Sequence, residues 1–241
     1  MFTNTYDELN RPLESIVDNG TTEITFQKVI YGEGATTPEN LNLKGKPWKS
    51  YDGTGETVVS GYDFKGAPIS TTLKFTTDYD GLPNWSGSPT LESAEYINSM
   101  EMDALGRLVS FTTPDGKTTF NTYNEAGLLE TVSVNTELII EDIDYNVKGQ
   151  RNAIYYGNGS KTRYDYDPKT FQLKRLLSTK DTGSVILQDL HYSYDAVGNI
   201  IRIKDDALQM AYFNDAVIYA IKKSGQNILN ALSHAARRGN E

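Results

Sequence analysis

The sequence predicts an all-β fold, a strip of antiparallel β-hairpins followed by a short C-terminal helix. Three observations lead to this expectation. A short signature recurs at steps of 21 or 22 residues. It consists of a Tyr or Met, then Asp or Asn, and a Gly four positions after the first residue. An Asp-Gly or Asn-Gly pair lies midway through the unit, and β-rich runs of about seven residues separate the turns. Self-similarity at a period of roughly 20 to 25 residues indicates a repeat protein.

The Tyr-Asp-x-x-Gly signature is most regular between Met102 and Tyr194. Seven Tyr-Asp pairs occur in the chain, where random order gives about one. The Gly suits a turn position that requires positive φ. In the Tyr166 unit Thr170 stands where Gly is expected, and the preceding Pro168 predicts a different turn. The residues that we expect to define the repeat structurally are Tyr6, Asp7, Tyr51, Asp52, Gly55, Tyr62, Asp63, Gly66, Asp103, Gly106, Tyr123, Gly127, Tyr145, Gly149, Tyr166, Asp167, Tyr194, Asp195 and Gly198.

The second turn of each unit lies 12 to 14 residues after the first residue of the repeat, at Asn19-Gly20, Asp115-Gly116 and Asn158-Gly159. Asn-Gly and Asp-Gly favour type I′ hairpin turns, in which both central residues have positive φ. Each unit is therefore expected to contain two strands and two turns.

Two segments rich in Gly, Pro and Thr, at about 31–40 and 76–93, interrupt the repeat and are expected to be loops. We expect one repeat strip over 1–214 and a non-repeat tail over 215–241. Apolar residues of the tail fall at helical spacing, which predicts an interrupted amphipathic helix. This tail is either a scar of a frameshift or truncation, or a helix that covers an open sheet edge.

Composition narrows the classes of partner. The net charge is −9 and the isoelectric point about 4.8, which disfavours nucleic acid or an anionic membrane as a partner. The absence of Cys excludes disulfides and thiolate metal sites. No apolar run is long enough to span a membrane, and the first residues lack the pattern of a signal peptide. We expect synthesis in the cytoplasm, from a piece of a longer coding sequence.

No combination of residues predicts catalysis. His191 and His234, the two histidines, have no context typical of a catalytic triad or a zinc site. Asp165 and Asp167 share one face of a predicted strand, but calcium needs about six or more oxygen ligands. We therefore expect no catalytic residue, no metal, no cofactor and no enzymatic activity.

The unit Tyr-Asp-x-x-Gly-x-Leu, with its Asp-Gly or Asn-Gly midway and a return to Tyr, resembles the RHS or YD repeat over about residues 2–213. Residues 40–45, 51–55 and 61–66, and again 188–199 with 203–206, resemble the repeat region of the C component of bacterial insecticidal toxin complexes. Nothing after Asn214 matches the core segment that carries the cleaving aspartates in that family.

The resemblance implies a spiralling hollow β-shell that encloses a toxic C-terminal polypeptide. Its expected partners are the rest of the shell, the enclosed toxin and a B-type component of the toxin complex, and full-length relatives act as secreted or delivered toxins. The alternative is a separate module that binds glycans or another surface. Trp48 and Trp85 are the candidates for sugar stacking, and packing of the irregular segments against the sheet is their other expected role.

Overall fold

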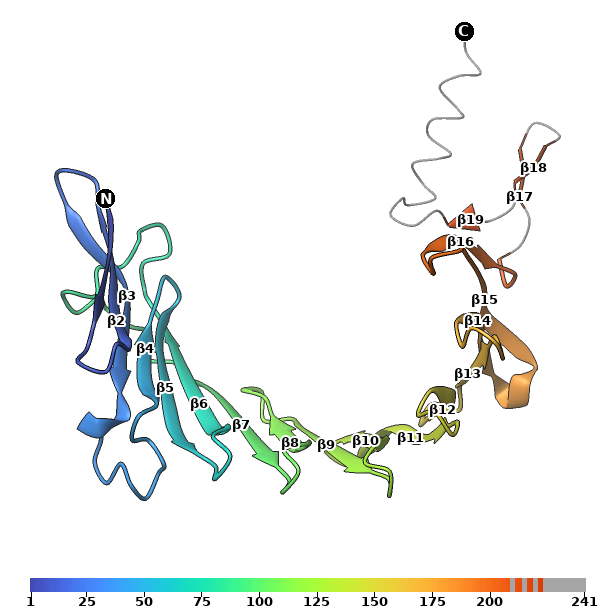
Figure 1. Cartoon of the computed structure of the whole chain (residues 1–241), viewed down its shortest axis with the longest axis horizontal. Coiled ribbons are helices and arrows are strands. Elements are labelled where there is room, and N and C mark those ends of the chain that lie inside the picture. Colours follow the sequence, from blue (N-terminus) through green and yellow to red (C-terminus); the bar gives the residue numbers. More distant parts are fainter. Residues whose placement is uncertain (209–210, 214–215, 219–220, 223–241) are drawn as a thin grey trace, which may run out of the picture. The chain divides into compact units, whose positions relative to one another are not determined.

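A computed structural model describes residues 1–208, 211–213, 216–218 and 221–222. All strand pairings among these residues are antiparallel, which confirms the predicted all-β class (Figure 1). The chain divides into two compact units, Met1–Phe120 and Asn121–Glu241. The boundary between them falls within the predicted repeat strip over 1–214.

The first unit is a meander in which each strand pairs with the next one in sequence. Its strands are β1 (Phe2–Tyr6), β2 (Pro12–Asp18), β3 (Glu23–Tyr31), β4 (Pro47–Tyr51), β5 (Gly55–Tyr62), β6 (Pro68–Phe75), β7 (Tyr96–Met102), β8 (Leu108–Thr112) and β9 (Thr118–Tyr123), the last three residues of β9 belonging to the second unit. A 3-10 turn, η1 (Gly32–Gly34), follows β3.

The second unit continues the same pattern. Its strands are β10 (Leu129–Val134), β11 (Glu137–Tyr145), β12 (Arg151–Tyr156), β13 (Lys161–Tyr166), β14 (Leu173–Lys180), β15 (Val185–Tyr194) and β16 (Ile200–Asp205), with η2 (Asp181–Gly183) after β14. Strands β17 (Ala211–Phe213) and β18 (Ala216–Ile218) pair with each other, and β19 (Ile221–Lys222) pairs with β16.

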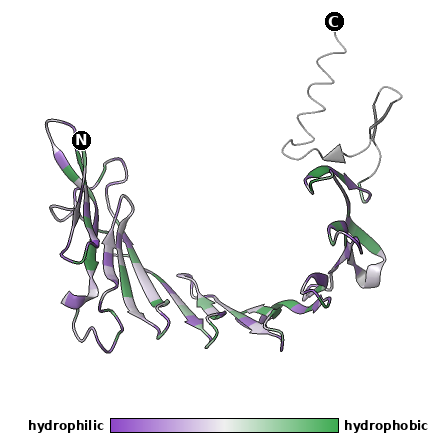
Figure 2. Cartoon of the chain, viewed as in Figure 1, coloured by the Kyte–Doolittle hydropathy of each residue, from purple (hydrophilic) through white to green (hydrophobic). Residues whose placement is uncertain are grey.

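Consecutive pairing places the turns alternately at two edges of each unit. We call the edge with the turns after odd-numbered strands the Tyr edge, because most of those strands end in Tyr, and the other the opposite edge. Hydrophilic and hydrophobic residues mix along most strands (Figure 2). Few apolar side chains of the described residues are buried, namely Leu43, Tyr62, Trp85, Ile143, Ala153 and Ile154. Strand pairing and the turns therefore carry much of the order.

The turns of the opposite edge differ from the type I′ prediction. At Asp115-Gly116 only Gly116 has positive φ, 78°. The Gly116 N–H donates to the Thr113 carbonyl (2.9 Å), and the Thr113 N–H donates to the Lys117 carbonyl (2.9 Å). This is a three-residue loop that ends in a Gly bulge, so one residue needs the left-handed conformation and not two. The type I′ prediction is wrong here and, by the same bonds and φ values, at Asn158-Gly159.

Both irregular segments are longer than predicted. The first runs over 32–46, between β3 and β4, and is anchored by the fully buried Leu43. Gly32 lies against Leu43 so closely that a Cβ there would lie 2.3 Å from the Leu43 carbonyl oxygen. The second segment runs over 76–95, between β6 and β7, and Thr76 forms an isolated bridge with Leu91. Local contacts give these segments their order, although their sequences lack any periodicity.

The predicted helical tail is wrong where the structure describes it. Ala216–Ile218 and Ile221–Lys222 are strands. This stretch is a short apolar run with β-branched residues, and helical spacing cannot be told from a buried strand in such a run. The rest of the predicted helix, 223–241, lies outside the described residues. Among the residues that the structure describes, no helix is long and apolar enough to cross a membrane.

Candidate functional site

The turns of the Tyr edge are built by one side chain, as the turn after β7 shows. The Gly106 N–H donates to the Asp103 carbonyl (2.9 Å), and Gly106 has a φ of 81°. The Asp103 Oδ1 atom accepts the N–H groups of Leu105 (2.8 Å) and Arg107 (2.9 Å). The carboxylate thus satisfies two backbone donors that face into the loop, and Gly takes the left-handed position.

The same bonds recur in turn after turn. An Oδ1 atom accepts the N–H groups two and four positions later at Asp7, Asp63, Asn124, Asn146 and Asp195. Asp167 instead accepts from Lys169 and Thr170, and Phe171 replaces Gly at positive φ, 60°. The different turn predicted around Pro168 is thereby confirmed. Asn serves as well as Asp because the bonds need an acceptor oxygen and no charge.

These bonds hold the aspartates in their ionised form. Backbone bonds from Arg11, Ala67, Arg107 and Thr170 lower the pKa values of Asp7, Asp63, Asp103 and Asp167, respectively. A side-chain bond from Asn199 is the main cause that lowers the pKa of Asp195. Two of the carboxylates also pair with an Arg, Asp7 with Arg11 and Asp103 with Arg107, both at 2.6 Å.

Five of the tyrosines that precede a turn of the Tyr edge donate a hydrogen bond to the neighbouring turn of the same edge. In the first unit the Tyr31 hydroxyl donates to the Pro12 carbonyl (3.2 Å) and that of Tyr62 to the Pro47 carbonyl (2.6 Å). In the second unit the donor and acceptor pairs are Tyr145 and Leu129 (2.7 Å), Tyr166 and Arg151 (3.0 Å), and Tyr194 and Leu173 (2.7 Å). Burial raises the pKa values of Tyr62, Tyr166 and Tyr194, so their hydroxyls keep the donated proton.

The acceptor always has the same place in the repeat. It lies two residues after the positive-φ residue of its turn, as Pro12 follows Asn10 and Arg151 follows Gly149. In four cases the acceptor residue is also the strand-pairing partner of the tyrosine that precedes its own turn. These pairs are Pro12 with Tyr6, Pro47 with Tyr31, Arg151 with Tyr145 and Leu173 with Tyr166. Each hydroxyl therefore joins one hairpin to the next, and we call this series of bonds the Tyr ladder.

Cations cover two rings of the ladder. The Arg11 guanidinium lies 4.0 Å from the centre of the Tyr31 ring, and the Lys46 Nζ atom lies 4.6 Å from that of Tyr62. Both cations directly follow the positive-φ residue of their turn, Asn10 or Gly45. Cation–π contact adds to the bond from the hydroxyl.

The structure reassigns part of the predicted repeat. Tyr51, Asp52 and Gly55 form a turn at the opposite edge, where the Asp52 Oδ1 atom accepts from Thr54 (2.7 Å). The ladder position belongs to Tyr31, which the sequence reasoning missed because Gly follows it in place of Asp. A Tyr at the end of a β-rich run was the available signal. Tyr6, 55% exposed, begins the series, and Tyr123 with Gly127 belongs to the turn at 124–127.

Met102 occupies the ladder position before the turn at 103–106. Pro68 stands at the acceptor position, because it pairs with Tyr62. A thioether has no proton to donate, so this rung lacks its hydrogen bond.

The second irregular segment is tied to the sheet of the first unit at Trp85. The Trp85 N–H donates to the Thr25 carbonyl (2.8 Å), and its indole Nε1 donates to the Asp52 carbonyl (3.0 Å). The ring lies over Tyr51 with centroids 4.9 Å apart. Trp85 is 5% exposed, so it packs the segment and offers no face to a sugar. Trp48 is half-buried beside Lys49, and sugar stacking there stays a prediction.

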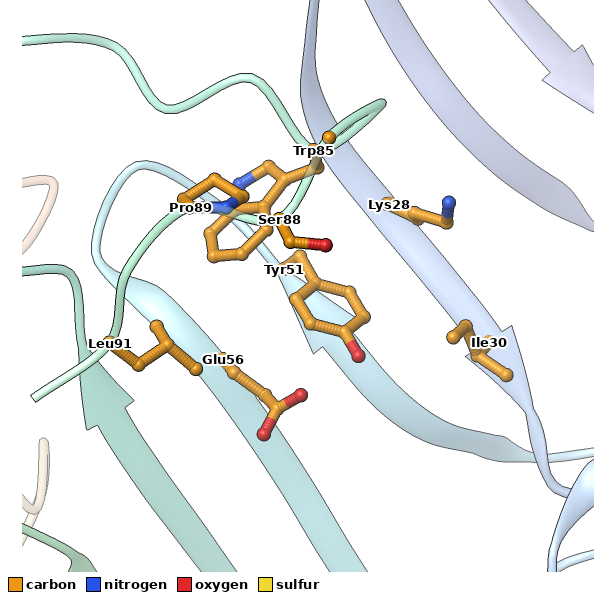
Figure 3. A pocket seen from close by; sticks show the side chains of 9 residues that line it. Lys28, Ile30, Tyr51, Glu56, Trp85, Ser88, Pro89 and Leu91 are labelled. Atoms are coloured by element: carbon orange, nitrogen blue, oxygen red, sulfur yellow. The ribbon is translucent and has the colours of Figure 1, made fainter. Parts of the chain in front are cut away.

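A pocket of about 240 Å³ lies beside Trp85 (Figure 3). Lys28, Tyr51 and Glu56 are register partners on β3, β4 and β5 and face it together. Burial, with a hydrogen bond to Glu56, raises the pKa of Tyr51 to about 12. Lys28 pairs with Glu14 at 3.3 Å. The polar groups of the pocket thus have partners, Tyr51 with Glu56 inside it and Lys28 with Glu14 beside it.

His191 lies in a charged cluster formed by β14, β15 and the residue that follows β16. Arg175 forms two bonds with the buried Asp189 carboxylate (2.6 and 2.7 Å), and the His191 Nε2 atom lies 3.2 Å from Asp189 and 3.3 Å from Asp206. Opposite charges meet here across neighbouring strands, which stabilises their pairing. In the part of the chain that the structure describes, no group of three or more His, Asp or Glu residues could hold a metal ion.

Comparison with known proteins agrees with this geometry. A model of the RHS Repeat family matches residues 103–137, which run from one Tyr-edge turn through the next. This part of the chain is similar to the RHS repeat. Toxin subunit YenC2 of Yersinia entomophaga is 26% identical to it over an alignment of 265 residues, which covers 95% of this chain and 27% of that protein. Toxin subunit YenC1 of the same organism is 28% identical over 223 residues, 84% of this chain and 23% of that protein.

Solved structures share the fold. The crystal structure of TcdB2-TccC3-Cdc42 is 26% identical and superposes with a TM-score of 0.78, over 88% of this chain and 10% of that chain. That of TcdB2-TccC3-TEV gives the same TM-score and identity over 86% of this chain and 10% of that chain. The chain spans about a quarter of the length of the curated toxin subunits that it matches.

Restoring the missing rung should stabilise the first unit. In Met102→Tyr the new hydroxyl can reach the Pro68 carbonyl, and we expect the free energy of unfolding to rise by about 0.5–1.5 kcal/mol, the net value of one hydrogen bond. Urea unfolding followed by circular dichroism measures it. Met102→Phe is the control for the ring alone, and equal stability of the two variants would contradict the ladder.

The turn aspartates should make the stability of the fold depend on pH. Their pKa values are lowered in the folded state, so their contribution is present at neutral pH and is lost as pH falls below the ordinary value of 3.8 and through the folded pKa. We expect the melting temperature to fall between about pH 4 and pH 2.

Asp103→Asn tests this dependence at one turn. It keeps the acceptor oxygen, as Asn124 and Asn146 do, but removes the titrating group. We expect a smaller loss of melting temperature in acid than in the unsubstituted chain. An unchanged acid dependence would show that the turn carboxylates do not cause it.

Proposed function

We propose that this chain is a segment of a toxin-complex shell and acts as a structural, encapsulating module. The likeness to the TcdB2-TccC3 structures over most of the chain is the observation that carries the proposal. Two curated toxin subunits align with nearly the same part of the chain and support it. In this proposal the chain forms part of the shell wall, and the enclosed partner is a toxic C-terminal polypeptide.

The way the sheet is held suits a wall. A sheet stabilised by a packed core must cover one of its faces, whereas the Tyr ladder and the Asp-capped turns stabilise hairpins from their edge. Both faces of the strands then stay available, one toward the enclosed polypeptide and one toward water. A repeat of two strands can be added many times without any new packing, because each repeat contacts only its neighbours.

The same proposal makes the chain a non-enzyme. Its polar groups are used in structure, since turn aspartates accept backbone N–H groups and Asp189 is held by Arg175. We further propose that the remainder of an RHS shell and a B-type component are its partners. We also propose that it is made in the bacterial cytoplasm and acts as part of a delivered toxin.

Grafting tests the proposal. Residues 1–208 would replace the matching segment of a full-length C-type toxin subunit that retains its C-terminal toxic polypeptide. We expect the chimera to protect that polypeptide from added protease as the parent does. The same graft with Ile154→Pro is the control, since proline at this buried position of β12 breaks the strand and should expose the polypeptide. A chimera that has the parent's size and β-content but loses protection would contradict an encapsulating role.

A further inference from the structure

One hairpin of the second unit leaves part of a strand edge uncovered. Strand β15 pairs with β16 only over 190–194, and one further backbone bond joins the Asp206 N–H to the Asp189 carbonyl (2.8 Å). Over residues 185–188, β15 has β14 on one side, and no described strand pairs with its other side. The backbone N–H and C=O groups on that side form an open edge, which can pair with another strand.

The open edge is apolar as well as exposed. Val185, Ile186 and Leu187 are 44%, 54% and 53% exposed. Side chains of a strand alternate between its two faces, and every residue over 182–188 is exposed, so neither face of this stretch is covered. An exposed hydrophobic edge strand is a site at which another chain adds a strand.

The stretch lacks the residues that usually protect a strand edge. Natural proteins blunt such edges with charged residues, above all Lys, or with Pro, and residues 182–188 contain neither. The next carboxylate along β15, that of Asp189, is buried and held by two bonds from Arg175 (2.6 and 2.7 Å). A bulge shifts the register between β14 and β15, but Ile186 still pairs with Thr179 beyond it, so the strand continues.

We propose that residues 185–188 form an interface at which two copies of this chain pair edge to edge as antiparallel strands. The occupant of this edge must be extended, must have an open edge of its own and must be apolar on both faces. The same stretch of a second copy meets all three conditions. A two-fold axis between Ile186 and Leu187 places these residues opposite each other and Val185 opposite Gln188, so the contact is self-complementary.

Charge favours this stretch over the charged parts of the surface as the contact between copies. The chain carries a net charge of −9, so two copies repel each other as a whole. Residues 182–188 include no charged side chain, and two such edges therefore meet without bringing carboxylates together. The association does not depend on the proposed shell function, because it uses one open strand edge and no enclosed polypeptide.

Sedimentation velocity of the full chain between about 5 and 500 μM measures the association. The paired stretch is short and buries a small area, so we expect a reversible dimer with a dissociation constant on the order of 10–100 μM. Ile186→Lys brings a charge from each copy into the contact and should weaken the dimer at least about tenfold. Ile186→Thr keeps a β-branched side chain and removes only apolar contact, so we expect about threefold. Ile186 is exposed, so the melting temperature should change little in either variant.

Hydrogen exchange shows whether the backbone edge is the contact. A peptide that covers 185–188 should exchange more slowly at about 500 μM than at about 5 μM, because pairing protects its outward amides. Contact through side chains alone would leave these amides in water. Peptides from β12 and β13 should exchange equally at both concentrations.

The matched control is Leu138→Lys, which adds the same charge at an apolar residue that is 43% exposed. Leu138 lies on β11, which has a paired strand on each side, β10 and β12. We expect this variant to dimerise as the unsubstituted chain does.

A full chain that stays monomeric up to about 500 μM overturns the proposal and leaves the edge to a different occupant. So does a dimer that Ile186→Lys leaves unchanged, one that Leu138→Lys weakens equally, or one that forms without protecting 185–188.

Discussion

The hydrogen bond from a tyrosine hydroxyl to the backbone carbonyl of the neighbouring turn is the interaction on which the rest of this structure depends. A meander of short strands has little core to hold its hairpins in place, and few apolar side chains of the described residues are buried. The bond joins each hairpin to the next at a fixed point, two residues after the left-handed residue of the turn. It thereby sets the register between repeats as well as adding stability.

The three defined positions of the Tyr-Asp-x-x-Gly signature act together in one turn. Gly adopts positive φ so that the chain can reverse, the Asp oxygen accepts the loop N–H groups, and the reversed chain presents a carbonyl to the next Tyr. The parts tolerate substitution according to their chemistry. Asn124 and Asn146 replace Asp because they keep the acceptor, and Phe171 replaces Gly in a turn of different length. Met102 cannot replace the hydroxyl.

The sequence was sufficient to predict what the repeat itself determines, the all-β class, the turn positions and most ladder residues. It was insufficient where partners are distant. Tyr31 and Tyr51 could not be told apart, because the edge to which each belongs depends on counting strands past an irregular segment. Trp85 was a candidate for sugar binding until contacts with Thr25 and Asp52 showed it buried. The short apolar run at Ala216–Ile218 fits a helix or a strand equally well.

The most direct test of the ladder is removal of its hydroxyls in the second unit, by Tyr145→Phe, Tyr166→Phe and Tyr194→Phe together. These changes keep the rings, so the account predicts a loss of about 1 kcal/mol for each bond, or roughly 3 kcal/mol in the free energy of unfolding. Native-state hydrogen exchange should show faster exchange across β10 to β16. Tyr6→Phe is the control, at an exposed ring that begins the series. A triple variant no less stable than that control would contradict the claim that the ladder holds the repeats together.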